Sequence, residues 1–293
     1  MKRNIKISAI IGAMILCGAM SVHAQNRHEI SFSGFGGMSN LKYEATFGNP
    51  KIGFGGGFGL GYQVFFSPQW GLGTGAEFAF FNAGYNLDGI DLRYPTKDMD
   101  GNAFVFSSKA GKYEETQSAG LVQIPLMLQF QTGDNHQFFV AFGGKAGIPV
   151  TAKYKTSALS IQNSGFYAEE NYEYATRKFM GFGLFNIPAD NSELKFKTAF
   201  FFSAEIGGKF RLTDANKLYI GVFLDYGLNN IVETQNLASL PHFIEYNSQN
   251  PREFAVNSIL QSKSTEAFTE KLSPMAVGIK LRLAFGKGSI EQK

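Results

Sequence analysis

Hydrophobic and polar residues alternate with period two on both sides of a short polar stretch, Gly133–Asn135. In the segment Thr116–Gln131, every second residue from Val122 to Phe130 is large and apolar, and glutamines lie between them. The segment His136–Ala152 repeats the pattern. Alternation of this kind is typical of a β-strand with one apolar face. The two segments therefore predict a β-hairpin with arms of about 15 residues, much longer than the usual five or six of a globular strand.

The same alternation recurs along the chain and predicts eight strands. They are His28–Gly37, Lys51–Phe66, Trp70–Ala83, Thr116–Gln131, His136–Ala152, Thr198–Leu212, Lys217–Asn229 and Leu272–Phe285. Very short connections follow the second, fourth and sixth strands, and the other connections are medium or long. The long ones are the polar stretches 84–115, 153–197 and 230–271, which we expect to be loops. This strict alternation of short and longer connections is typical of an antiparallel up-and-down barrel.

The distribution of glycine and charge predicts which face of the barrel is inside. A soluble eight-stranded barrel fills its interior with large apolar side chains. Here glycine dominates one parity of Lys51–Phe66 and Trp70–Ala83, and the other parity of every strand is almost free of charge. An apolar outside around a small or polar inside indicates a membrane barrel, whose closure satisfies the backbone in lipid. We therefore expect an all-β fold: an eight-stranded antiparallel up-and-down transmembrane β-barrel with periplasmic termini, short periplasmic turns and long extracellular loops.

The amino-terminal residues have the features of an export signal. Lys2, Arg3 and Lys6 flank the start of the apolar stretch Ile7–Met20, and Ala24 completes a small-residue cleavage site. We expect residues 1–24 to be a cleaved signal peptide and residues 25–293 to form a single outer-membrane barrel domain. The expected location is the outer membrane of a bacterial cell.

Composition adds two constraints on function. The chain has 27 Lys and Arg against 24 Asp and Glu, and loss of three basic residues with the signal leaves 24 against 24. A neutral mature chain gives no indication of nucleic-acid binding. Cys17, the only cysteine, lies in the signal, so the mature chain can form no disulfide and has no thiol nucleophile.

The central hairpin also resembles a known family. Its segments Leu121–Phe130 (LVQIPLMLQF) and Phe138–Pro149 (FFVAFGGKAGIP) are similar to the outer-membrane β-barrel family common in Bacteroidota, which includes porin-like and OmpA-like transmembrane barrels. The resemblance covers essentially the whole mature chain, with this hairpin as its specific part. For such a barrel we expect contact with outer-membrane lipid, insertion by the barrel-assembly machinery with periplasmic chaperones, and no cofactor.

Charged residues on the inward parity form the first group of candidate functional residues. They are Glu77, Lys145, Glu205, Lys209, Arg211, Asp225, Lys280 and Arg282. An eight-stranded interior is only wide enough to be packed with side chains, and a buried charge without a partner is costly. We expect these residues to pair with one another as lumen packing. The alternative is a small or gated pore whose lumen is closed by exchangeable ion pairs.

The histidines of the mature chain give little support for catalysis. Only His242 lies in a predicted loop, with Ser239, Glu245 and Ser248 near it in the sequence. A single loop histidine is more often a solvated surface residue than a general base. Neither His nor Cys shows a metal-ligand spacing. We therefore expect no catalytic, cofactor-binding or metal-binding residues, and a protein that is not an enzyme.

Aromatic residues in the predicted extracellular loops indicate a binding role instead. Tyr85, Tyr113 and Tyr154 lie near strand ends, where we expect them to form an interfacial aromatic girdle. The cluster Gly165–Tyr174 is the best candidate for a contact surface, on which a protein or glycan ligand would bind. Its candidate contact residues are Phe166, Tyr167, Tyr172 and Tyr174. The sequence thus favours a structural or loop-mediated binding role, with the pore as the alternative and an enzyme less expected.

Overall fold

The computed structural model describes residues 27–45, 48–132, 136–232, 237–264 and 267–286, in which eight long antiparallel strands form a closed ring. The strands are β1 (Arg27–Ala45), β2 (Asn49–Phe65), β3 (Trp70–Lys97), β4 (Ala103–Thr132), β5 (His136–Thr156), β10 (Ala199–Arg211), β11 (Asn216–Gly227) and β14 (Thr269–Phe285). Each strand pairs with the next in this order, and β14 pairs with β1 to close the ring. The predicted all-β antiparallel ring of eight strands is confirmed. The predicted signal peptide, 1–24, and the turn 133–135 lie outside the described residues.

No helix in the described part of the chain is long and apolar enough to cross a membrane.

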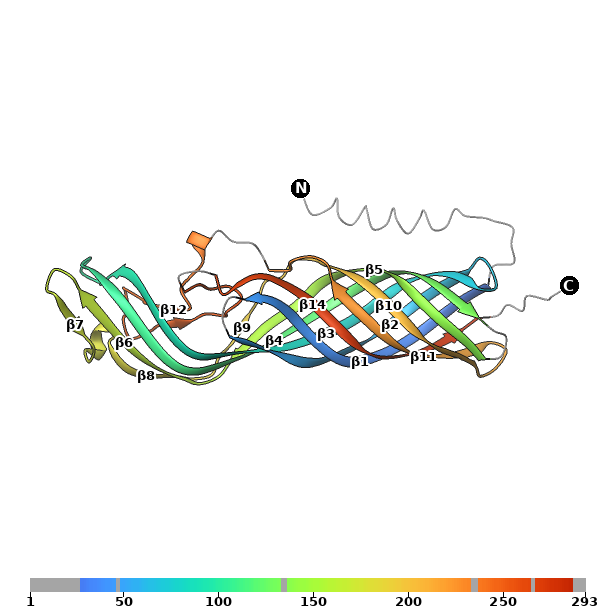
Figure 1. Ribbon diagram of the computed structural model, residues 1–293, viewed down its shortest axis with the longest axis horizontal. Helices are drawn as coiled ribbons and strands as arrows, with labels where there is room; N and C mark the ends of the chain where they lie inside the picture. The colour runs from blue at the N-terminus through green and yellow to red at the C-terminus, as the bar shows by residue number, and fades with distance from the viewer. Residues whose placement is uncertain (1–26, 46–47, 133–135, 233–236, 265–266, 287–293) are drawn as a thin grey trace.

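The two ends of the ring differ. At one end, which we call the turn end, β2 leads into β3 and β10 into β11 through reversals of a few residues. Thr213 shapes the second reversal by accepting hydrogen bonds from the backbone N–H groups of Ala215 and Asn216. Ile30 lies opposite Phe285 in the register, so the start of β1 and the finish of β14 are also at the turn end (Figure 1). The opposite end, from which the long connections leave, is the loop end.

Large apolar side chains cover the outside of the ring. Leu60 is 64% exposed, Ile30 61% and Leu126 56%. Residues of the opposite parity on the same strands, such as Glu29 of β1 and Gln63 of β2, are buried in the interior. This apolar belt runs from Trp70, Phe210 and Phe285 at the turn end to Phe80, Val150 and Phe200 toward the loop end. The predicted assignment of apolar outside and polar inside is confirmed.

Glycines of β2 make room for an aromatic ring inside the barrel. A Cβ atom at Gly57 would collide with the carbonyl oxygen of Phe78 and the ring of Phe35. Phe35 is the large inward residue of β1 at this height, directly opposite Gly57 in the register. The glycine-rich parity of β2 therefore compensates for the volume of Phe35.

Two prolines interrupt the backbone hydrogen-bond ladders at different points. The sequence alone does not fix their place in these ladders. Pro149 pairs with Leu121 at the bulge between β4 and β5, where the register shifts after Gly120. Pro125 lies where the β3–β4 pairing lapses between Thr74 and Glu77, and the Thr74 hydroxyl donates to the Pro125 carbonyl at 2.8 Å. Each proline thus stands where its missing N–H does not remove a regular ladder bond.

The prediction that 84–115 is a loop is wrong. β3 and β4 continue far beyond the belt as a paired hairpin, with Tyr94 opposite Phe106 and a turn at 98–102. The apolar alternation continues through Leu87, shifts at Gly89, whose φ is 92°, and resumes at Ile90. Polar residues on the outer parity of this stretch give it the composition of a loop, although its inner parity remains apolar.

The stretches 153–197 and 230–271 also contain strands that the sequence analysis assigned to loops. These are β6 (Leu159–Tyr167), β7 (Tyr172–Tyr174), β8 (Gly183–Ile187), β9 (Asn191–Glu193), β12 (Ile244–Glu245) and β13 (Ala255–Val256), with short 3-10 turns η1 (Lys178–Met180) and η2 (Leu237–Ser239). β6 adds to β4, and β7 and β8 pair with β6. Together with the distal parts of β3 and β4 they form an extension that projects from the loop end, at the left of Figure 1.

The extension has its own hydrophobic core. Phe104 packs against Phe182 and Tyr246 with ring centroids 5.5 and 5.2 Å apart. The Tyr94 hydroxyl donates to the carbonyl of Ile244 and accepts from the N–H of Tyr246. These contacts fix the last long connection against the face of the β3–β4 hairpin, so the extension is a packed body.

The predicted aromatic girdle is wrong for its three proposed members. Tyr85 and Tyr113 are completely buried, and Tyr154 is half-buried against the same core. Tyr85 lies on the same inward face of β3 as Phe81. It follows the predicted strand end, but its side chain faces the interior and not the outer surface.

We predict that Phe106→Ala loosens the extension and leaves the barrel intact. Phe106 is fully buried between Tyr94 and Tyr246, and removal of such a ring costs about 3–5 kcal/mol. Hydrogen exchange read by mass spectrometry should become faster in 90–110 and stay unchanged in β10 and β11. Phe179→Ala is the control, because Phe179 is 59% exposed. Equal exchange in the two variants would contradict a core at this position.

Candidate functional site

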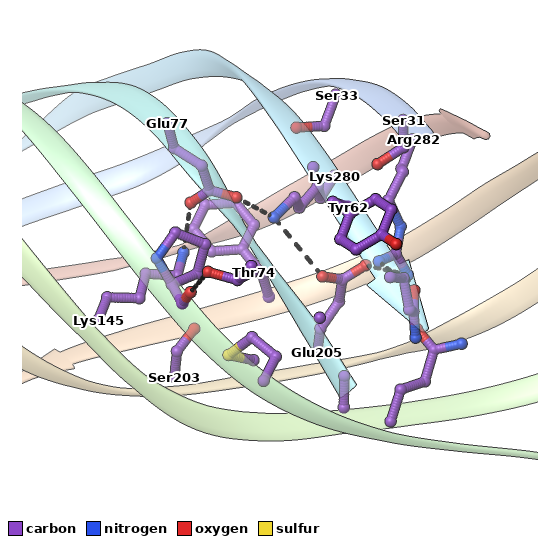
Figure 2. A pocket seen from close by; sticks show the side chains of 18 of the residues that line it. Ser31, Ser33, Tyr62, Thr74, Glu77, Lys145, Ser203, Glu205, Lys280 and Arg282 are labelled. Atoms are coloured by element: carbon purple, nitrogen blue, oxygen red, sulfur yellow. Dashed lines mark hydrogen bonds and ion pairs between the residues drawn. The ribbon is translucent and has the colours of Figure 1, made fainter. Parts of the chain in front are cut away.

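Charged side chains from five strands meet in the middle of the barrel interior. Glu77 on β3 accepts hydrogen bonds from Lys145 on β5 at 2.8 Å and from Lys280 on β14 at 2.5 Å. Lys145 also donates to Asp225 on β11 at 3.0 Å, and Lys280 lies 3.6 Å from Glu205 on β10. Figure 2 shows Glu77, Lys145 and Lys280 pointing toward one another across the lumen.

These contacts cross the lumen. Because β3, β5 and β14 are not neighbours in the ring, the pairs at Glu77 join strands that share no backbone pairing. Glu77 and Lys145 are each only 6% exposed, and Asp225 is 1% exposed. A charge buried this deeply is tolerated only with a partner of opposite sign and good geometry. The network therefore makes each member depend on the others.

A second cluster lies closer to the turn end, around Glu29 of β1. Its carboxylate accepts hydrogen bonds from Lys217 at 2.8 Å, Lys209 at 3.2 Å and the Tyr219 hydroxyl at 2.6 Å. Arg27 completes the cluster, with its Nε atom 3.2 Å from the same carboxylate. Glu29 thus ties β1 to β10 and β11 from the inside.

The structure places seven of the eight predicted lumen charges inside the barrel. They are Glu77, Lys145, Glu205, Lys209, Asp225, Lys280 and Arg282. Arg211 is the exception, because its side chain is 55% exposed and pairs with Asp214 of the adjacent turn. It follows Lys209 by two residues, at the point where β10 leaves the interior. The prediction that Arg211 belongs to the lumen is therefore wrong.

Glu29 and Lys217 are interior charges that the sequence analysis missed. Their parity would have identified them. Glu29 precedes the outward Ile30, and Lys217 precedes Leu218 on the parity that also carries Asp225. Both lie near strand ends. There, a charged residue in the barrel interior and one exposed to solvent show the same two-residue spacing in the sequence, so the spacing does not distinguish them.

Little open volume remains in the network. A cavity of about 50 Å³ lies between Glu77, Glu205 and Arg282. That is room for a few water molecules and no larger solute.

The last long connection packs over the interior at the loop end. Glu115, an inward residue of β4 that is 1% exposed, accepts hydrogen bonds from the Ser258 hydroxyl at 2.7 Å and the Ile259 N–H at 3.1 Å. Tyr113 and Gln117 donate to the same carboxylate at 2.8 and 2.6 Å. Ser258 and Ile259 are themselves buried, so this contact fixes the connection against the inner face of β4.

The four predicted contact residues of the extension divide into two groups. Phe166 and Tyr172 are 37% and 57% exposed, and Tyr174 is half-buried with its hydroxyl donating to Glu170 at 2.6 Å. Tyr167 is only 6% exposed, because it stacks on Phe104 inside the extension. Tyr167 is therefore a core residue, and its prediction as a contact residue is wrong. We call Phe166, Tyr172 and Tyr174 the aromatic tip.

Sequence reasoning did not single out other exposed apolar residues of the extension. They are Met99, Phe179 and Leu184, at 61%, 59% and 57% exposure. Leu184 lies on β8 opposite Gln162, on the same outward parity of β6 as Phe166. This parity could be assigned only once the pairing of β6 was known.

His242 does not have the geometry of a general base. Its ring lies flat on Tyr94, with the centroids 3.5 Å apart and the planes at 3°. Glu245 accepts a hydrogen bond from the backbone N–H of His242, not from its ring. Burial lowers the pKa of the His242 imidazole, which keeps the stacked ring neutral at neutral pH. Among the described residues, no group of three or more His, Cys, Asp or Glu is arranged to hold a metal ion.

We predict that Glu77→Gln lowers the free energy of unfolding by about 3 kcal/mol, since it removes the shared partner of two buried lysines. Arg211→Gln should cost less than about 1 kcal/mol, because its ion pair is exposed. Urea unfolding of both variants in lipid vesicles measures the difference. Equal losses would mean that the interior network contributes no more than a surface pair.

Comparison with known proteins places this architecture in a family. The family model of the outer membrane protein beta-barrel domain matches residues 23–233. Among solved structures, the outer membrane protein OprG from Pseudomonas aeruginosa is 11% identical, with a TM-score of 0.33 over 91% of this chain and 97% of OprG. Ail, the attachment invasion locus protein of Yersinia pestis, is 11% identical with a TM-score of 0.29 over 88% of this chain and 97% of Ail. No curated protein sequence matches the chain.

The matched residues include β1 to β11, and therefore seven of the eight strands of the ring. The apolar belt and the polar interior of the described residues agree with such a barrel. The chain belongs to the outer membrane protein beta-barrel domain family, and its location is the bacterial outer membrane.

Proposed function

We propose that this protein is a binding barrel, which uses its extension to hold an aromatic tip outside the cell for contact with a protein or glycan. The observation that carries the proposal is the packed core of the extension, formed by residues such as Phe104, Tyr167 and Tyr246. A surface on a preorganised body loses little conformational entropy when it binds. A purely structural barrel would not require a projecting body of this kind.

The proposal includes an orientation. Outer-membrane barrels have short turns on the periplasmic side and longer connections outside. The turn end, with β1 beginning and β14 ending beside it, is then periplasmic, and the extension is extracellular. Assembly by the barrel machinery with periplasmic chaperones, and contact of the apolar belt with lipid, belong to the same proposal.

The aromatic tip supplies the contact chemistry. Phe166 and Tyr172 expose large rings of few rotamers, and such side chains are enriched among residues that dominate binding energy. Phe166 lies beside the buried Tyr167, whose hydroxyl donates to Asp98 at 3.2 Å. This bond and the Tyr167 stacking hold the backbone under Phe166 in place, which favours recognition over nonspecific adhesion.

The pore alternative receives less support. Glu77 and Glu29 hold lysines across the lumen, the cavity between Glu77, Glu205 and Arg282 is about 50 Å³, and the segment at Ser258 packs over the loop end. A solute path would require all three obstacles to move together. We also propose that binding occurs without catalysis, since the His242 ring is packed on Tyr94.

The orientation predicts labelling of introduced cysteines on intact cells. Because the mature chain is expected to contain no cysteine, each introduced thiol is a unique probe. Ser160→Cys, exposed on β6, should react with a membrane-impermeant maleimide on intact cells. Thr213→Cys, exposed at the turn end, should react only after the outer membrane is permeabilised. The reverse pattern would overturn the orientation.

The aromatic tip predicts a loss of binding in the double variant Phe166→Ala with Tyr172→Ala. Residues that dominate an interface cost about 2 kcal/mol or more when truncated, so retention should fall more than tenfold. The purified full chain would be applied to arrays of glycans and of extracellular matrix proteins. Ser160→Ala with Gln162→Ala, which changes exposed polar side chains of β6, the strand of Phe166, is the matched control.

Two results would count against the binding role. One is a wild-type protein that binds nothing on either array. The other is a double variant that binds every wild-type target equally well while hydrogen exchange confirms a folded extension.

A further inference from the structure

The Glu29 cluster at the turn end of the barrel holds more positive than negative charge. Arg27 Nε, Lys209 Nζ and Lys217 Nζ lie 3.2, 3.2 and 2.8 Å from one oxygen atom, Glu29 Oε1. The other carboxylate oxygen accepts a hydrogen bond from the Tyr219 hydroxyl, which brings no net charge. Among the described residues, three cations therefore share a single carboxylate, and two positive charges are left over.

The central network cannot supply the negative charge that would balance this cluster, because it is balanced in itself. Within the described part of the chain its ion pairs join equal numbers of cations and acids: Lys145, Lys280 and Arg282 with Glu77, Glu205 and Asp225. Asp214 is a further acid at the turn end, but its side chain is 94% exposed and pairs with Arg211. The excess of positive charge thus belongs to Arg27, Lys209 and Lys217.

The excess charge lies in a buried setting. Lys209 is 3% exposed and Glu29 1%. The Nη2 atom of Arg27 is buried, and it has no hydrogen-bond acceptor among the described residues. A cation without a counter-charge is costly in such surroundings, since burial removes the water that would solvate it. The cluster therefore favours an additional anion.

Neutral groups around the cluster attract the cations and leave their charge uncompensated. Arg27 Cζ and Lys209 Nζ lie 4.0 and 4.8 Å from the centroid of the Phe65 ring. Lys209 also donates to Gln131 Oε1 at 2.9 Å. An aromatic face and an amide oxygen stabilise a cation by their partial charges, but neither carries a net charge. These contacts hold the cations close together, which strengthens their joint attraction for an anion.

The cluster is accessible to a small ion from the turn end. Arg27 is paired with Phe65, the last residue of β2, and Lys217 with Ala284, next to the last residue of β14. Their side chains are 12% and 11% exposed, in contrast to the deeper Lys209. An ion therefore reaches Arg27 and Lys217 without passing the Glu77 network.

We propose that the Glu29 cluster binds a chloride ion between Arg27 and Lys217. An ammonium group has three N–H donors, and Lys217 donates only to Glu29 among the described residues. The buried Nη2 of Arg27 supplies a further donor. A compact monovalent ion suits this place, because side chains that already meet at Glu29 Oε1 leave little room for a larger oxyanion. The ion reinforces the tie between β1 and β11 at the turn end.

The test is urea unfolding of the full chain in lipid vesicles over a series of sodium chloride concentrations. Sodium gluconate keeps the ionic strength constant, so that general screening does not change. A ligand that binds only the folded protein stabilises it by mass action. The free energy of unfolding should therefore rise with chloride, by up to about 1.4 kcal/mol for each tenfold increase above the dissociation constant.

Variants at the turn end identify the site. Lys217→Glu replaces a cation by a carboxylate and balances the cluster with Arg27 and Lys209. Its stability should no longer depend on chloride, and in gluconate it should at least equal that of the wild type. Arg27→Gln removes one proposed ligand and should raise the half-saturating chloride concentration about tenfold or more. The matched control is Arg211→Gln, which removes a positive charge from the exposed pair at the same end and should keep the wild-type dependence.

Three results would overturn the proposal. One is a wild type whose stability does not respond to chloride, the result expected if a buried lysine loses its proton instead. Another is a Lys217→Glu variant with the wild-type dependence or, if that variant does not fold, an Arg27→Gln variant with it. The third is equal stabilisation by sulfate at the same ionic strength, which would reject a halide site. None of these outcomes involves the extension, so they are independent of the binding role and its tests.

Discussion

Closure of the sheet is the constraint on which the rest of this structure depends. In lipid there is no water to form hydrogen bonds with backbone N–H and C=O groups. The two edge strands of a sheet must therefore pair with each other. The pairing of β1 with β14 meets this requirement. Once the ring is closed, successive side chains of a strand face opposite environments. The Ile30 side chain faces the lipid and the Glu29 side chain faces the interior. The exposed apolar belt and the buried charges are thus two results of the same closure.

The narrow interior then determines how the charges are arranged. Glu77 reaches lysines from β5 and β14, and Glu29 reaches lysines from β10 and β11, because no part of an eight-stranded lumen is far from any other. The Phe35 ring fits among them, with the Lys145 and Lys280 ammonium groups 5.9 and 5.6 Å from its centroid. Such contacts favour cations over an aromatic face. The interior therefore acts as a packed core made of polar groups.

The features that follow from the two-residue alternation could be predicted from the sequence. The features that depend on which strands pair in the folded chain could not. Strand number and inward parity were predictable, since Leu126 and Gln129 differ in parity whatever the partner strands are. The extension was not predictable from the sequence. The outward residues of 84–115 are polar and give the stretch the composition of a loop, although Tyr85, Leu87 and Leu92 continue the apolar pattern of the inward face. Phe166 and Tyr167 are adjacent aromatics, and only the pairing of β6 with β4 shows which one is buried. Arg211 has the right parity but lies beyond the lumen.

Continuity of β3 and β4 links the membrane part to the extension. Both strands run without interruption from the belt to the far turn at 98–102, so no flexible linker separates the barrel from the extension. Glu115 reinforces this junction by fixing Ser258 and Ile259 against β4. The orientation of the aromatic tip is therefore set by the barrel.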